Sequence, residues 1–195
     1  MTRTQAQRSA ATRQALVDVT IELLIERGWA GTTAVAVCER AGVTRGALVH
    51  HYPSLSALLA HALESLYDDF TKRPRRTPVS MLSAVEGVWR AVGDRRFKAV
   101  LEAWSAAAND PELAAELRPA ITRFAKLVSP DNSRPDSPLG RSDAREFFLM
   151  AREAMIGLAF GRATNGGRPL GHERAVLTRL REEARRFGEG QREVR

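Results

Sequence analysis

The residues of this chain whose types and spacing could do chemistry lie together in the run TTAVAVCERAGVTRGALVHHY, from Thr32 to Tyr52. Thr44 and Arg45 stand side by side, and paired histidines follow at His50 and His51. An arginine near the start of a helix can donate two hydrogen bonds to guanine O6 and N7, and the backbone N–H groups there can bind phosphate. The run therefore predicts contacts with nucleic acid.

Two short helices joined by a tight turn would position these side chains. Thr33 and Thr44 stand where an N-cap hydroxyl would accept a backbone N–H, which predicts helices from about Thr33 to Arg40 and from about Thr44 to His51. Gly42 occupies the turn, where a left-handed backbone is needed. Small and apolar residues have the spacing of a shared miniature core: Val37, Cys38, Ala41, Val43 and Leu48. The alternative is a plain helical hairpin whose glycine only ends a helix.

Composition bounds the partners and the setting of the chain. Its 195 residues hold 30 lysines and arginines against 23 aspartates and glutamates, and this basic balance favours a polyanionic partner without selecting one. Cys38 is the single cysteine, so no intramolecular disulfide can form, and a reducing, cytoplasmic setting is expected. No apolar run approaches the roughly 20 residues of a membrane-spanning helix. We therefore expect a soluble chain with no membrane partner.

The remaining elements also follow a helical period, which predicts an all-α fold. The first helix is expected from about Ser9 or Thr12 to Arg27, where Gly28 ends it. The basic, proline-containing segment 71–78 predicts a linker, and the polar stretch 129–142 predicts a loop. The other expected helices are one from about Ser54 to Phe70, three amphipathic helices after the linker, and two final helices from about Asp143 to Thr164 and from about His172 to Phe187. The predicted domains are a helix-turn-helix domain at 1–53, a connecting helix and linker at 54–78, and a helical effector-binding and dimerisation domain at 79–195.

The run from Gly28 to Leu63 resembles the DNA-binding domain of tetracycline-repressor (TetR) family regulators. A glycine followed by an aromatic residue, a threonine pair, an Ala-Gly-Val turn and a short helix ending near His-Tyr carry the resemblance. The motifs of the resemblance cover about Ser9 to Phe70. The rest of the chain resembles the family only in the number and length of its helices. The resemblance implies about nine helices: three for reading DNA, one connecting, and five for ligand binding and dimerisation.

The resemblance also implies which residues contact DNA. Val49 stands where a tyrosine that hydrogen-bonds the DNA backbone is common, and Ser56 stands where a phosphate-binding lysine is common. Both departures remove contacts with the DNA backbone. The affinity for DNA is therefore expected to depend more on Arg45, on the tandem histidines, or on the N-terminal arginines Arg3, Arg8 and Arg13. The full set of predicted DNA contacts is Arg13, Thr33, Thr44, Arg45, Gly46, Ala47, Val49, His50 and His51.

Two further sets are predicted in the C-terminal part of the chain, and intrachain packing is the alternative for both. Apolar and mostly aromatic side chains on helix faces are candidates for lining an effector pocket: Trp89, Phe97, Leu101, Trp104, Phe124 and Phe147. Small and apolar residues of the last two helices are candidates for a dimer interface: Ala151, Ala154, Gly157, Leu158, Gly161, Val176, Leu180, Ala184 and Phe187.

The sequence as a whole predicts a homodimeric, sequence-specific DNA-binding regulator. Its expected partners are palindromic operator DNA and an unidentified small, largely apolar effector that releases a repressor from that DNA. No cofactor, metal or catalytic residue is expected, since the four histidines lack zinc-ligand spacing and no nucleophile elbow or phosphate loop occurs. One alternative is a helical ligand- or partner-binding adaptor that has lost operator binding; the other is a small helical enzyme.

Overall fold

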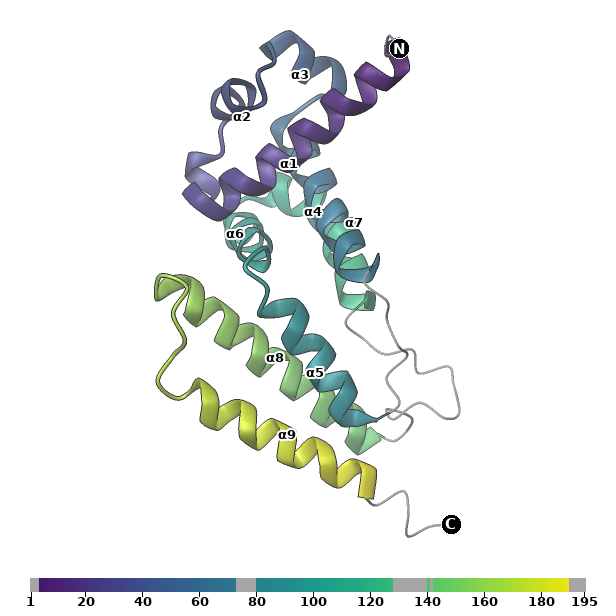
Figure 1. The fold of residues 1–195 in the computed structure, drawn as a ribbon, viewed down its shortest axis with the longest axis vertical. Coiled ribbons are helices and arrows are strands. Elements are labelled where there is room, and N and C mark those ends of the chain that lie inside the picture. Colours follow the sequence, from purple (N-terminus) through teal and green to yellow (C-terminus); the bar gives the residue numbers. More distant parts are fainter. Residues whose placement is uncertain (1–3, 73–79, 128–139, 141, 190–195) are drawn as a thin grey trace. The chain divides into compact units, whose positions relative to one another are not determined.

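The computed structural model describes residues 4–72, 80–127, 140 and 142–189, and these residues form helices without any strand (Figure 1). Arg3, the linker from residue 73 onward, and all of the 129–142 loop except residues 140 and 142 lie outside the described residues. The all-α prediction is confirmed. Within the described ranges the nine helices are α1 (Gln5–Gly31), α2 (Ala34–Ala41), α3 (Arg45–His51), α4 (Leu55–Lys72), α5 (Met81–Val92), α6 (Phe97–Ala107), α7 (Pro111–Leu127), α8 (Ser142–Thr164) and α9 (Glu173–Glu189).

Helix α1 differs from its predicted bounds at both ends. It begins at Gln5 because Thr4 caps it: the Thr4 hydroxyl accepts the Gln7 N–H, and the Gln7 side chain accepts the Thr4 N–H. At Gly28 the backbone turns to φ 68°, ψ −171°, and a further helical turn runs to Gly31. Gly28 was therefore identified correctly as a break, but the short turn beyond it was missed.

The chain divides into two compact units, and the first comprises residues 1–69 and 98–124. It contains α1 to α3, most of α4 and α7, and α6 from Lys98 onward. Large apolar side chains fill its interior with no more than 2% exposure: Leu16, Leu23, Leu24, Leu58, Leu59, Leu63, Leu66, Tyr67, Leu113 and Leu117. This core supports the three helices at the N-terminus.

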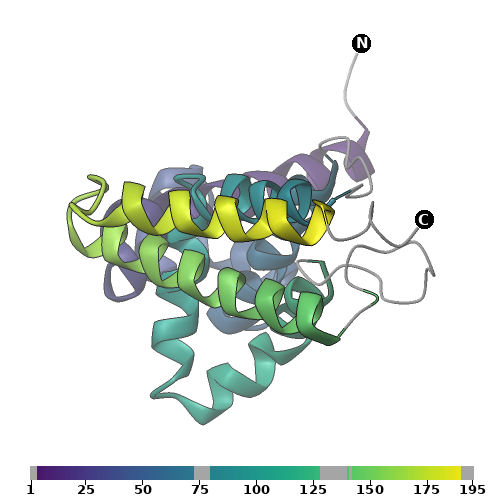
Figure 2. The same ribbon diagram turned by 90° about the horizontal axis from the view of Figure 1, so that it is seen from below.

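The second unit comprises residues 70–97 and 125–195. Helices α8 and α9 lie side by side and antiparallel in both views, and α5 packs against both of them (Figures 1 and 2). Gly166 and Gly167 turn the chain between α8 and α9 with φ of 64° and 80°. The functional domains expected at 1–53, 54–78 and 79–195 stay a prediction, and they divide the chain differently from these compact units.

None of the helices within the described ranges is both long and apolar enough to cross a membrane.

Candidate nucleic-acid interface

The turn between α2 and α3 is built around Gly42. This residue has φ 66° and ψ 34°, the left-handed conformation that glycine adopts without steric cost. The N–H of Gly42 donates to the Glu39 carbonyl at 3.3 Å, and the N–H of Val43 donates to the Cys38 carbonyl at 3.0 Å. These bonds satisfy two of the last four carbonyls of α2 and direct the chain into α3.

Apolar side chains of α2 and α3 form the predicted miniature core. Val37 is 0% exposed, Leu48 is 3% exposed and Cys38 is 7% exposed, so all three are buried. Ala41 and Val43 are half-buried at its margin. Leu48 is the buried side chain of α3, so most of the other residues of this helix face outward.

Both predicted N-caps are present. The Thr33 hydroxyl accepts the Ala36 N–H at 3.1 Å, and the Thr44 hydroxyl accepts the Ala47 N–H at 3.2 Å. Each hydroxyl uses an oxygen lone pair for its cap and keeps its proton for an acceptor such as a phosphate oxygen. Because both threonines are exposed, each can hold its helix and still face a ligand.

Helix α3 presents most of its predicted contact residues to solvent. Arg45, Gly46 and His50 are exposed, and Val49 is 57% exposed. Ala47 and His51 are half-buried, and the His51 ring meets the His50 ring edge to face with centroids 5.3 Å apart. The arrangement gives one short helix with a cation at its start and an imidazole near its end.

Arg13 of α1 has a structural partner that sequence reasoning missed. Its Nε donates to the Tyr52 hydroxyl at 3.2 Å, and its guanidinium carbon lies 5.2 Å from the centre of that ring. Burial raises the pKa of Tyr52, and the hydrogen bond from Arg13 opposes the rise. Since Tyr52 caps the C-terminus of α3, Arg13 fixes the end of this helix.

Val35 of α2 is 56% exposed and was also absent from the predicted contacts.

The six residues predicted to line an effector pocket fall into both compact units. In the first unit Leu101 is buried, and Phe124 packs against Trp104 and Tyr67 with ring centroids 5.4 and 4.8 Å apart. The others, Trp89, Phe97 and Phe147, belong to the second unit. Their contacts there include the Arg162 guanidinium 5.0 Å from the Trp89 ring and the Phe187 ring stacked 5.1 Å from Phe147. That the six line one pocket stays a prediction.

The residues predicted for a dimer interface differ in exposure. Ala151, Leu158, Leu180 and Ala184 are buried within the second unit, Gly157 is exposed, and the other four are half-buried: Ala154, Gly161, Val176 and Phe187. A Cβ added at Gly161 would lie 2.5 Å from Leu170 Cδ1, so this glycine makes room for its own chain. Met150 and Phe160, at 59% and 49% exposure, are the large apolar residues that α8 exposes, and they were not predicted.

Among the residues that the structure describes, no group of three or more histidine, cysteine, aspartate or glutamate side chains could hold a metal ion.

Comparisons with known proteins agree with this geometry. A sequence model described as bacterial regulatory proteins, tetR family, matches residues 16–62. The chain is 28% identical over 166 residues to the HTH-type transcriptional regulator CymR of Pseudomonas putida. This match covers 80% of this chain and 82% of that protein. It is 30% identical over 135 residues to an HTH-type transcriptional regulator of Mycobacterium tuberculosis, covering 66% of this chain and 69% of that one.

The fold also matches solved structures. One is native NalD, the secondary repressor of the MexAB-OprM multidrug efflux pump in Pseudomonas aeruginosa, with a TM-score of 0.60 and 17% identity. The match covers 92% of this chain and 96% of that one. The similarity therefore extends well beyond the N-terminal helices.

Proposed function

This chain belongs to the tetR family of bacterial regulatory proteins and is a DNA-binding transcriptional regulator, and from this premise we propose that it is a homodimeric repressor. The dimer binds a palindromic operator and leaves it when a small, largely apolar effector binds. It acts in the bacterial cytoplasm by binding alone, without catalysis or a cofactor. The observation that carries the proposal is α3: a capped, seven-residue helix whose outer face exposes Arg45, Val49 and His50.

The proposed mechanism places one α3 from each protomer in successive major grooves. The two recognition helices of such a dimer lie about 34–36 Å apart, one turn of B-DNA, so a two-fold symmetric protein reads a palindrome. Arg45 would read a base, while the exposed threonines and backbone N–H groups at the starts of α2 and α3 would hold phosphates. An effector that favours a different separation of the two helices would lower operator affinity by its differential affinity for the two states.

A direct test measures binding to the DNA upstream of the chain's own gene. Fluorescence anisotropy with a labelled fragment, repeated with a scrambled fragment of the same length and composition, gives the specificity ratio. We expect tight binding to the upstream fragment and a footprint with two-fold symmetry. Equal affinity for both fragments would contradict the proposal and favour an adaptor that has lost operator binding.

The aromatic cluster of the first unit supports an apolar effector. Tyr67, Trp104 and Phe124 pack together as a cluster of large aromatic side chains, with polar edges on the tyrosine and the tryptophan. Titrating the operator complex with a panel of small aromatic and aliphatic compounds, read out as release of labelled DNA, tests this class of effector. Release only by charged or sugar-like compounds would contradict it.

The exposed face of α8 supports the proposed dimer. Met150, Gly157 and Phe160 recur at seven- and three-residue spacing, and a Cβ added at Gly157 would meet nothing within 4 Å. We predict that Phe160→Ala raises the dimer dissociation constant about fivefold, or roughly 1 kcal/mol, because a large apolar contact is lost. Sedimentation equilibrium measures this constant. Phe160→Leu, which keeps most of the apolar area, should stay close to wild type, and an unchanged constant for both variants would exclude this face.

A pair of variants at Arg13 and Tyr52 can test the predicted DNA contact of Arg13. If its guanidinium also meets a phosphate, Arg13→Ala should weaken binding to all sequences alike and reduce the salt slope by about 0.9, the value for one phosphate contact. Tyr52→Phe keeps the ring and removes only the hydroxyl that accepts from Arg13, so it should leave the slope unchanged. Equal losses of affinity in the two variants at the wild-type slope would mean that Arg13 acts only through Tyr52.

A further inference from the structure

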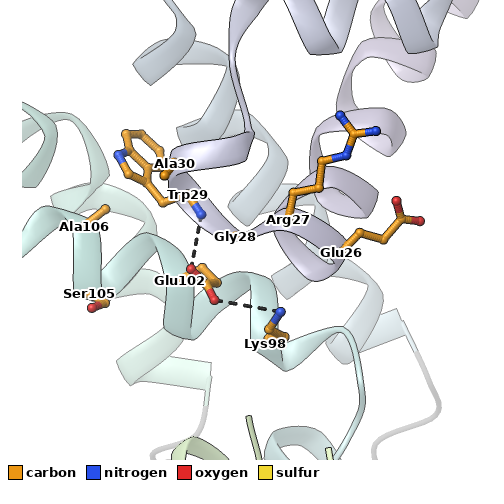
Figure 3. Close-up of a pocket in the computed structure, with 9 residues that line it drawn as sticks. All are labelled: Glu26, Arg27, Gly28, Trp29, Ala30, Lys98, Glu102, Ser105 and Ala106. Carbon is orange, nitrogen blue, oxygen red and sulfur yellow. Dashed lines mark hydrogen bonds and ion pairs between the residues drawn. The ribbon is translucent and has the colours of Figure 1, made fainter. Parts of the chain in front are cut away.

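The kink at Gly28 separates two backbone groups of α1 that a regular helix would join. In such a helix the Trp29 N–H would donate to the Ile25 carbonyl, four residues earlier. Here the Trp29 N–H donates to Glu102 Oε2 of α6 at 3.1 Å (Figure 3). The Ile25 carbonyl accepts instead from Lys98 Nζ, also of α6, at 2.6 Å. One turn of α6 thus supplies both the acceptor and the donor that the kink took away.

Lys98 and Glu102 are arranged to act as a pair. They stand four residues apart on α6, and Lys98 Nζ lies 3.9 Å from Glu102 Oε1, so each carboxylate oxygen faces a different partner (Figure 3). Gly28 makes their approach possible in two ways. Its backbone conformation is one that other residues rarely adopt, and a Cβ there would lie 2.8 Å from Glu102 Oε2.

The segment after the kink leads directly into the helix-turn-helix. The Thr32 hydroxyl donates to the Gly28 carbonyl at 2.8 Å, and Thr32 is 2% exposed. The next residue, Thr33, caps α2. Hydrogen bonds therefore connect the α6 pair to the start of α2 with no unconstrained linker between them.

We propose that Lys98 and Glu102 are positioning residues for operator binding: together they replace the missing Ile25–Trp29 hydrogen bond and set the direction in which the chain leaves α1 toward α2 and α3. The inference rests on the proposed operator binding. Neither residue belongs to the helices that would meet DNA. The second segment of the first compact unit begins at Lys98. The pair therefore holds the start of this segment against α1.

The test uses side-chain removals of opposite charge. Lys98→Met lowers the net charge and Glu102→Ala raises it, so an effect of charge alone would weaken DNA binding in one variant and strengthen it in the other. Positioning predicts that both variants weaken operator binding, by about three- to tenfold, the range for one lost hydrogen bond. Binding to a scrambled fragment should change less than twofold, and the salt slope should match that of wild type.

Further variants complete the design. Glu102→Gln keeps an oxygen for the Trp29 N–H and should recover most of the affinity, and the double variant Lys98→Met/Glu102→Ala should lose less than the product of the two single losses. Two controls are expected to bind as wild type: Ser105→Ala, at a residue of α6 that lines one surface pocket together with Lys98 and Glu102, and Glu116→Ala on the exposed face of α7. Affinities are compared at a temperature where circular dichroism shows each variant folded. Lys98→Met keeps side-chain bulk and suffices if Glu102→Ala does not fold, because an effect of charge alone would also weaken binding to the scrambled fragment and reduce the salt slope.

The outcomes separate the inference from the function on which it rests. A wild-type chain that does not prefer the operator fragment contradicts the proposed function itself. A wild-type chain with that preference, and variants that bind the operator equally well, overturns the positioning role. Equal losses on operator and scrambled DNA with a reduced salt slope would make Lys98 a phosphate contact and would also overturn it.

Discussion

Arg45→Ala is expected to weaken operator binding by about 1–3 kcal/mol, or roughly 5- to 150-fold, with a much smaller loss on unrelated DNA. Arg45 is the first residue of α3, follows the Thr44 cap, and is exposed. Gly46 beside it has no side chain to hold the backbone away from the groove edge. A guanidinium at this place can donate two parallel hydrogen bonds to one guanine, and alanine leaves both acceptors unpaired.

A panel of operator fragments with single base-pair substitutions measures this role. The wild-type chain should discriminate strongly at one position in each half-site, and Arg45→Ala should lose discrimination there alone. Arg45→Lys is the matched control, since it keeps the charge but not the planar fork, so it should keep the salt slope and lose most of the base preference. A variant with unchanged preference at every position would show that Arg45 does not read a base.

The helix-turn-helix could be predicted closely because its determinants are local. The caps at Thr33 and Thr44 and the left-handed Gly42 each act on backbone groups no more than four residues away. Their residue types therefore fixed α2 and α3 to within one residue of the observed bounds. The start of α1 was missed although the same kind of signal was present, a threonine followed by a glutamine three residues later at Thr4 and Gln7.

Contacts between distant segments could not be predicted in this way. Arg13 and Tyr52 are 39 residues apart, and Trp29 and Glu102 are 73 residues apart. Nothing in the local pattern distinguishes Arg13 from Arg8, or Glu102 from any other carboxylate on an amphipathic helix. Sequence reasoning assigned Arg13 to DNA and gave Glu102 no role, because the partners of both become visible only once the helices are packed.

Helical periodicity likewise identified apolar faces without identifying what covers them. Ala151 and Leu158 lie on the apolar side of α8 and are buried by their own unit, whereas Met150 and Phe160 are exposed on another face. Ala151 and Leu158 stand seven residues apart, as do Met150 and Gly157 on the exposed face, so spacing alone cannot separate a core face from an intersubunit face. Exposure in the folded unit separates the two faces: Met150 and Phe160 are exposed, and they are therefore better candidates for a dimer interface than Ala151 and Leu158.

Arg162→Ala is expected to destabilise the second unit by about 3 kcal/mol, because it leaves a buried carboxylate without its counter-charge. Arg162 of α8 donates through Nε to Glu173 Oε2 at 2.5 Å and through its terminal nitrogen to Oε1, and the Glu173 side chain is 7% exposed. The guanidinium also lies 5.0 Å from the Trp89 ring of α5. One side chain thus connects α5, α8 and α9, and urea denaturation measures its loss.

Glu173→Gln is the matched variant for this pair. It keeps an oxygen for Arg162 and removes the charge, so we expect it to cost less than Arg162→Ala. The double variant should be more stable than Arg162→Ala alone, because no uncompensated carboxylate remains. If Arg162→Ala unfolds at the wild-type urea midpoint, the pair does not stabilise the unit.

The same pair makes stability depend on pH in a defined direction. The Arg162 hydrogen bonds lower the pKa of the Glu173 carboxyl below its ordinary value of 4.5, so the unfolded chain binds the proton more readily than the folded chain. The contribution of the pair is therefore complete above pH 4.5 and declines as the pH falls through the lowered, folded-state pKa. The difference in Tm between the wild-type chain and Glu173→Gln should shrink as the pH is lowered from 6 toward 3, about one and a half units either side of 4.5. A difference that stays constant or grows over this range would mean that the Glu173 charge does not carry the stabilisation.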